Sequence, residues 1–134
     1  MDPGTLRMGV GVVDSISGEL TTPFHGCLSP KRSDPIEQRL AYLLQELEDV
    51  IGKVSPDSVA VEEPFVSQNP KTAIAIGQAQ AVVFLAAARH GIPVSRYAPT
   101  EVKKSVTDYG GSSKEQVNAM VCILLGNIEI NGPN

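Results

Sequence analysis

The spacing of apolar residues changes along this chain, and that change is what most limits the folds open to it. Residues 8–14 and 19–28 are rich in β-branched side chains and flank a Ser-Ile-Ser-Gly turn, which predicts a β-hairpin. Over residues 36–51, apolar side chains instead recur at steps of three, four and one, which predicts one apolar stripe on a helix ending near Gly52. The chain is therefore expected to be mixed α/β.

The other predicted elements alternate between strands and helices. They are a strand at 57–63, a helix at 70–90, a strand at 92–97, and helices at 100–107 and 113–125. With 134 residues, 42% of them apolar, the chain is long enough for one core and too short for two. We expect a single domain over residues 1–134, with element order β-β-α-β-α-β-α-α.

The two long helices carry recognisable start signals. Asp34 stands before Pro35 and three residues before Glu37, which predicts an N-cap and a capping box. Asn69 before Pro70 predicts a second N-cap, with proline in the first helical position. We therefore expect these residues to set where the two helices begin.

The helix over residues 70–90 is apolar on all sides. A helix without a polar face must be buried on more than one side, and in a small domain this predicts contact with a second subunit. No uninterrupted apolar run approaches the roughly 20 residues of a membrane span, so no membrane contact is expected.

The net charge of −4 is concentrated in one segment. Residues 34–57 hold six acidic and two basic residues, and charges elsewhere balance. A polyanionic partner is therefore not excluded, but this segment should face away from it. Cys27 and Cys122 form no Cys-x-x-Cys pair, so a reducing, cytoplasmic location is expected. His25 and His90 have no evident partner and are expected to carry no chemistry.

Two acidic residues are candidates for a functional site. Glu62 ends the strand at 57–63, and α/β sheets place ligands beyond the carboxyl ends of central strands. An ordinary polar strand end, with Glu63 beside it, explains that spacing equally well. Asp2, in an Asp-Pro-Gly-Thr turn, is a weak motif taken alone.

Five motifs in order resemble the RuvC-type Holliday junction resolvases, over essentially the entire chain. They are Asp-Pro-Gly-Thr-x-Arg-x-Gly, Val-Ala-Val-Glu-Glu-x-Phe, Asn-Pro-x-x-Ala-x-x-x-Gly-Gln-Ala, Val-Lys-Lys-Ser-Val and Ser-Lys-x-Gln-Val. The resemblance implies a ribonuclease H-like fold with a mixed sheet of order 3-2-1-4-5. It also implies symmetrical nicking of four-way DNA junctions by a homodimer, paired through the helix at 70–90. Family partners are the RuvA and RuvB branch-migration proteins.

The resemblance also assigns site residues. Asp2 and Glu62 match carboxylates that hold two Mg²⁺ ions per site, while Phe65, Lys103 and Lys114 match DNA-contacting positions. Two such cations can activate water and stabilise the leaving alkoxide, and Mg²⁺ prefers oxygen ligands. The family's Arg-Gly after Gly-Gln-Ala is replaced by Gln-Ala, which places a contact of that arginine in doubt.

The family's strand before Asp2 and its acidic last helix have no counterpart in this sequence. We therefore expect a domain truncated at both ends, with its first strand and last helix largely missing, that cleaves weakly or not at all. An alternative is a dimer that binds branched DNA without cutting it. An ATPase or sugar-kinase relative would need a second phosphate loop and a second domain, and the sequence shows neither.

Overall fold

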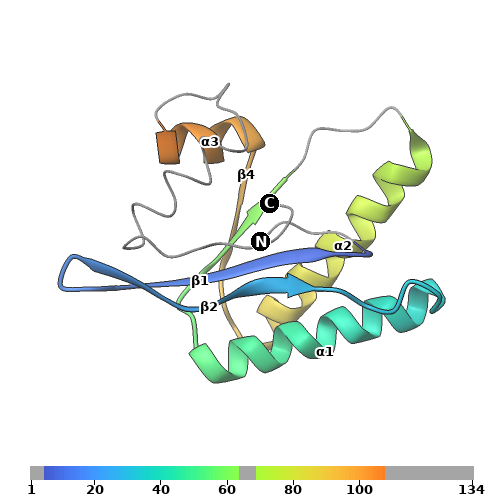
Figure 1. Ribbon diagram of the computed structural model, residues 1–134, viewed down its shortest axis with the longest axis horizontal. Coiled ribbons are helices and arrows are strands. Elements are labelled where there is room, and N and C mark those ends of the chain that lie inside the picture. Colours follow the sequence, from blue (N-terminus) through green and yellow to red (C-terminus); the bar gives the residue numbers. More distant parts are fainter. Residues whose placement is uncertain (1–4, 64–68, 108–134) are drawn as a thin grey trace.

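The computed structural model describes residues 5–63 and 69–107 (Figure 1). Its elements are β1 (Met8–Ile16), β2 (Glu19–Leu28), α1 (Ile36–Val54), β3 (Val59–Glu62), α2 (Pro70–Arg89), β4 (Val94–Tyr97) and α3 (Pro99–Thr107). This order confirms the predicted mixed α/β succession as far as α3. The helix expected over residues 113–125 lies outside the described residues.

β1 and β2 form the expected antiparallel hairpin. Pairing runs from Met8 opposite Leu28 to Ile16 opposite Glu19. The turn residues Ser17 and Gly18 both have positive φ, 52° and 84°, as in the two-residue turns that match the twist of hairpin strands. Serine adopts a positive φ less readily than glycine does, so the geometry of the tight turn, and not the preference of the serine, sets the conformation of Ser17.

β3 and β4 form a second, parallel pair. Val59 lies opposite Val94, and Glu62 lies opposite Tyr97. No strand pairing joins this pair to the hairpin within the described residues. A cavity of about 320 Å³ separates β1 from β3, lined by residues 10–13, 58–60 and the last turn of α1.

α1 begins one residue later than its capping signals indicated, and the predicted capping box is wrong. Pro35 occupies the N-cap position, and no side chain caps the helix. The backbone of Asp34 is instead used in a turn, where its N–H donates to the Lys31 carbonyl at 3.0 Å. The helix continues past Gly52 to Val54 and ends on Ser55, whose φ is 46°.

α2 begins and ends as its sequence predicts. The side chain of Asn69 accepts a hydrogen bond from the backbone N–H of Lys71 at 3.0 Å, so the predicted N-cap is confirmed. After Arg89 the chain reverses at Gly91, with φ at 68°, and the Ile92 N–H donates to the Ala87 carbonyl at 2.9 Å. Glycine adopts this left-handed conformation without strain.

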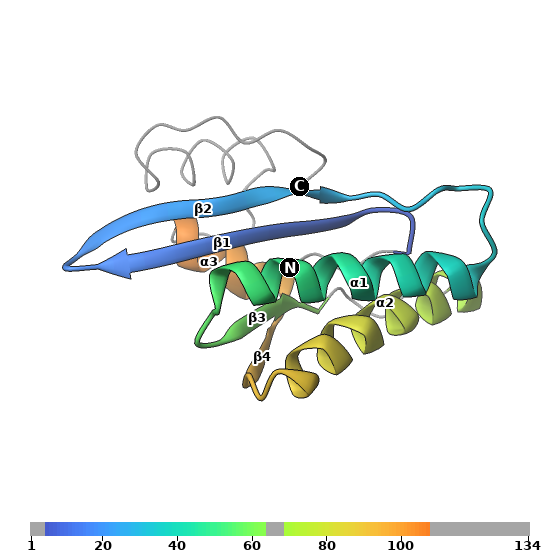
Figure 2. The ribbon, with the colours of Figure 1, turned by 90° about the horizontal axis from the view of Figure 1, so that it is seen from below.

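Apolar side chains from the strands, α1 and α2 form one core. Its fully buried large side chains are Met8, Leu43, Leu47, Val61 and Val83. α1 and α2 pack side by side (Figure 2). α3 lies on the other side of the strands from α1 (Figure 1).

α2 also modifies the expectation about membranes. In the described part of the chain, it is the one helix whose length and composition would suit a membrane span. That expectation considered only uninterrupted apolar runs. α2 reaches the mean hydropathy of a membrane span even though Gln78 and Gln80 interrupt its apolar residues. Its buried residues, Ala79, Val82, Val83, Ala86 and Ala87, pack in the core of the domain.

Candidate active site

Glu62 lies at the carboxyl end of β3, on the face of the strand that is turned from the core. Val59 and Val61 are 5% and 0% exposed and belong to the core, whereas Ala60 is exposed and Glu62 is half-buried. Because successive strand residues point to opposite faces, this alternation directs Glu62 away from α1 and α2. The same pattern of two valines and a terminal acid is what made Glu62 recognisable in the sequence.

Glu63 lies in a different environment from Glu62. Its backbone N–H donates to the Tyr97 carbonyl at 2.7 Å, which extends the parallel pairing by one residue. Its carboxylate lies 3.7 Å from the Arg96 guanidinium, and both side chains are about half exposed. Arg96 also covers the Phe84 ring, 5.0 Å from its centroid. Glu63 therefore serves an exposed ion pair on the side of α2.

α3 brings basic side chains to the edge of the sheet where Glu62 lies. It begins at Pro99, directly after β4, and the Glu101 carboxylate accepts a hydrogen bond from the Ala98 N–H at 3.3 Å. The helix carries Lys103, which is half-buried, and Lys104, which is exposed. Because β3 and β4 are parallel, their carboxyl ends meet at one edge, and α3 follows there (Figure 1).

The described residues therefore contain two of the five predicted site residues, Glu62 and Lys103, at one edge of the parallel pair. Asp2, Phe65 and Lys114 lie outside them. Within residues 5–63 and 69–107, no group of three or more His, Cys, Asp or Glu side chains could hold a metal ion. The Glu62 carboxylate has the oxygen chemistry that Mg²⁺ prefers, but a complete site needs further ligands such as Asp2.

The charges of the described helices are separated in space. The acidic segment predicted to face away from a polyanion forms α1 and its flanks, on the far side of the strands from α3 (Figure 1). The helix that carries Lys103 and Lys104 and the acidic helix α1 thus lie on opposite sides of the strands. A negatively charged ligand at the edge bearing Glu62 would meet α3 without approaching α1.

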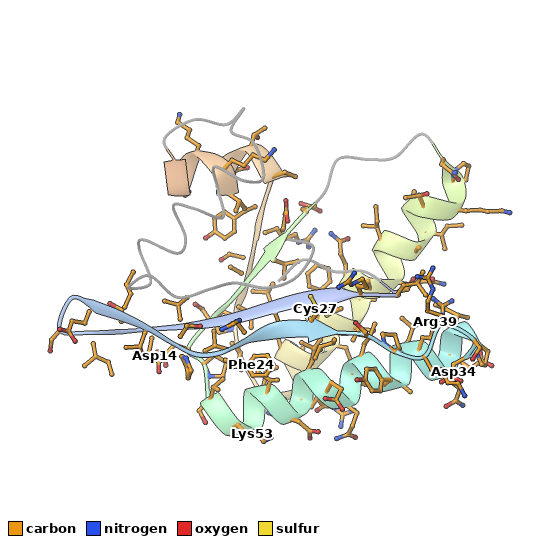
Figure 3. All side chains as sticks on the ribbon, in the orientation of Figure 1. Asp14, Phe24, Cys27, Asp34, Arg39 and Lys53 are labelled. Atoms are coloured by element: carbon orange, nitrogen blue, oxygen red, sulfur yellow. The ribbon has the colours of Figure 1, made fainter. Side chains whose placement is uncertain are left out.

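Sequence reasoning missed one polar contact near the start of the chain. Arg39, on α1 and labelled in Figure 3, donates from Nη1 to the Thr5 carbonyl at 3.4 Å and to Thr5 Oγ1 at 3.3 Å. The sequence could have indicated this contact, because Arg39 lies three residues after Ile36 and four before Leu43, on the apolar stripe of the helix. A charge at such a position needs a partner.

The expectation that His90 lacks a partner is wrong. Its Nε2 lies 3.1 Å from Oε2 of Glu48, which also receives Arg89 Nε at 3.3 Å. This cluster joins the end of α2 to α1. Cys27 is a free thiol, and Cys122 lies outside the described residues.

Comparison with known proteins agrees with this architecture. The family described as crossover junction endodeoxyribonuclease RuvC matches residues 1–133. A RuvC of that description from Dehalococcoides mccartyi is 48% identical over 134 residues, covering all of this chain and 80% of the relative. The Moorella thermoacetica protein is 42% identical over 127 residues, covering 94% and 75%.

A solved structure extends the agreement to three dimensions. Thermus thermophilus RuvC in complex with a Holliday junction substrate matches with a TM-score of 0.90 at 30% identity, over 98% of this chain and 81% of that one. The two sheets and their helices thus have the ribonuclease H-like fold of a nuclease. The chain belongs to the RuvC family of crossover junction endodeoxyribonucleases.

Proposed function

We propose that this chain acts on Holliday junctions by paired, metal-dependent hydrolysis of phosphodiester bonds, in DNA recombination and repair in the cytoplasm, and that its own cleavage activity is weak. The observation that carries the proposal is the position of Glu62, a half-buried carboxylate at the carboxyl end of β3, with the lysines of α3 following β4 at the same edge. The Thermus relative was solved with a junction substrate, which supports four-way DNA as the ligand.

In this proposal Asp2 and Glu62 supply carboxylate oxygens to Mg²⁺, two ions per site. When bound, the metal would activate a water molecule and stabilise the leaving oxygen. Lys103 and Lys114 would neutralise phosphates and set the register of the DNA, which adds affinity without sequence information. Phe65 would contact bases near the junction point.

A homodimer accounts for paired cuts, and α2 has a surface suited to form it. Ile74 and Leu85 are 61% and 49% exposed, and the smaller exposed residues Gly77, Ala81 and Ala88 lie on the same stripe. Their spacing of three and four residues places them on one face of the helix, opposite the buried face. A second copy covering this stripe would bring two sites onto one junction. RuvA and RuvB remain proposed partners without an assigned surface.

The decisive experiment compares Glu62→Gln with Glu63→Gln, two adjacent changes that remove the same charge. We expect Glu62→Gln to abolish the weak Mg²⁺-dependent junction cleavage while junction binding persists, because a metal ligand is lost. Glu63→Gln should cleave like the unaltered chain, since the Glu63 carboxylate forms an exposed ion pair with Arg96. Equal cleavage by both variants would contradict the role given to Glu62.

The same assay separates the enzyme from the alternative, a dimer that binds branched DNA without cutting it. Gel shift with a four-way junction, followed by added Mg²⁺, gives binding with nicking in the first case and binding alone in the second. Lys103→Gln should weaken binding in either case and reduce the dependence on log salt by about one unit. Lys53→Gln, on α1, is the control and should leave binding unchanged.

A further inference from the structure

Tyr97 is the direct neighbour of Glu62 in the parallel pair of strands. The two residues lie opposite each other in the register of β3 and β4, at the carboxyl ends of both strands. Paired strands are about 4.8 Å apart, so the two side chains start from neighbouring points of the sheet. Whether they can serve one ligand depends on the face to which each is directed.

The face of Tyr97 follows from the residues before it on β4. Val94 packs against the core, and Arg96 lies over the Phe84 ring of α2, 5.0 Å from its centroid. Because successive strand residues point to opposite faces, Tyr97 is directed away from α2. Glu62 is directed to that same face, because the valines of β3 are the buried residues of the strand. Tyr97 and Glu62 therefore share the face turned from the core.

Tyr97 presents an unused hydroxyl on this face. The residue is 42% exposed, although aromatic side chains contribute most when they are buried. Its backbone carbonyl accepts a hydrogen bond from the Glu63 N–H at 2.7 Å. Its hydroxyl, which can both donate and accept, has no hydrogen-bond partner within residues 5–63 and 69–107. The donor is thus available to a ligand that approaches Glu62.

A DNA phosphate at Glu62 needs such donors. The phosphate and the carboxylate repel each other, so hydrogen-bond donors and cations around them must offset that repulsion. α3 begins at Pro99, two residues after Tyr97, and carries Lys103 and Lys104 on its last two turns. Tyrosine hydroxyls are among the groups that bind phosphate oxygens in protein–DNA complexes. Tyr97 would add a neutral donor beside these cations.

We propose that Tyr97 is a DNA-contacting residue, whose hydroxyl donates a hydrogen bond to a backbone phosphate of the strand that lies at Glu62. The inference rests on the proposed function, in which the DNA backbone reaches Glu62. The contact requires no bound metal ion. It also reads no base, so it adds affinity for four-way junctions of any sequence.

The test compares Tyr97→Phe, which removes only the hydroxyl, with Tyr42→Phe. Tyr42 is 40% exposed, almost as much as Tyr97, and it belongs to α1, on the other side of the strands from α3 (Figure 1). Binding to a four-way junction is measured by fluorescence anisotropy in EDTA. We expect Tyr97→Phe to raise Kd by about 10-fold, as for a lost hydrogen bond to a charged group, and Tyr42→Phe to leave Kd unchanged. A Kd for Tyr97→Phe equal to that of the unaltered chain would overturn the proposal.

Salt dependence and thermal stability separate this contact from other causes of weaker binding. Tyr97→Phe should leave the slope of log Kd against log salt unchanged because it removes no charge, whereas Lys103→Gln should reduce that slope by about one. The melting temperature of Tyr97→Phe should also be unchanged, since the hydroxyl has no partner in the described chain. A reduced slope, or an affinity loss that only follows the loss of folded protein, would overturn the proposal.

A second measurement locates the contact on the DNA. Single phosphates near the branch point are replaced in turn by uncharged methylphosphonates. At one position, the unaltered chain and Tyr42→Phe should lose affinity on replacement while Tyr97→Phe loses less, because its contact is already absent. Equal losses by Tyr97→Phe and the unaltered chain at every position would overturn the contact. Junction binding by the unaltered chain without Mg²⁺-dependent cleavage would count against the proposed hydrolysis and leave these comparisons decisive for Tyr97.

Discussion

α1 and α2 are nearly equal in length, 19 and 20 residues, and they pack against each other, yet they distribute apolar residues differently. α1 buries one stripe and presents carboxylates to solvent. α2 buries one face and exposes Ile74 and Leu85 on another. Because burial of apolar area drives folding and association alike, the difference shows that α1 completes its packing within the domain, whereas α2 retains a surface that a partner could cover.

The largest expected effect concerns the buried stripe of α1. Leu47 is 0% exposed, so Leu47→Ala should lower the free energy of unfolding by about 2–5 kcal/mol through lost burial and the cavity left behind. Urea denaturation followed by circular dichroism measures the change. Leu20→Ala, at a leucine that is 41% exposed on β2, should cost less than half as much. Similar losses in both would mean that the α1 stripe is not the centre of the core.

The exposed stripe of α2 should govern association. In Leu85→Glu, a charge would be buried in the proposed dimer interface, which should weaken dimerisation by about 100-fold, equivalent to about 2.8 kcal/mol. Sedimentation velocity over a concentration series reports the change. Tyr42→Glu, at a residue 40% exposed on α1, is the matched control and should leave the sedimentation coefficient unaltered. A change in the sedimentation coefficient with Tyr42→Glu but not with Leu85→Glu would place the dimer interface on α1 instead of α2.

Gly91 and Gly52 differ in backbone conformation, because only Gly91 has a positive φ. Gly91, after α2, has φ at 68° and no atom within 4 Å of a built β-carbon, so Gly91→Ala should cost about 1–2 kcal/mol through backbone strain alone. Gly52 lies inside α1, also with open space around it, and Gly52→Ala should stabilise by about 0.5–1 kcal/mol. Thermal unfolding should therefore show opposite signs for the same substitution. Stability changes of the same sign in the two variants would be inconsistent with the backbone conformations of Gly91 and Gly52.

The smallest effect is expected where the helices exchange charges. Glu48 meets Arg89 and His90, but their side chains are 58% and 34% exposed, so Glu48→Gln should cost less than about 1 kcal/mol. The difference from the unaltered chain should shrink in 1 M salt, because exposed ion pairs are screened. Asp49→Asn, one residue further along α1, is the control. A salt-independent loss above 2 kcal/mol would show that the cluster has a larger structural role.

Most of the secondary structure could be predicted from local patterns. The β-branched runs predicted the hairpin, and Asn69 before Pro70 predicted the start of α2. The capping box at Asp34 failed for a physical reason. The Asp34 N–H and carbonyl are used by Lys31 and Arg39, and Pro35 takes the cap position instead.

The candidate site was predictable only in part. Glu62 follows from a strand whose apolar run stops at an acid, a local signal, whereas Lys103 was identified through family resemblance. The contact between Arg39 and Thr5 spans 34 residues, and no local period encodes such a distance. The partnership of His90 with Glu48 was missed for the same reason, since 42 residues separate them.

The sequence by itself determined which segments are strands or helices, which faces are apolar and that an acid ends β3, because these depend on residues a few positions apart. Only the tertiary structure decided that α1 and α3 lie on opposite sides of the strands, and that Arg39 holds Thr5. These features depend on tertiary packing, which brings into contact residues that lie far apart in the sequence.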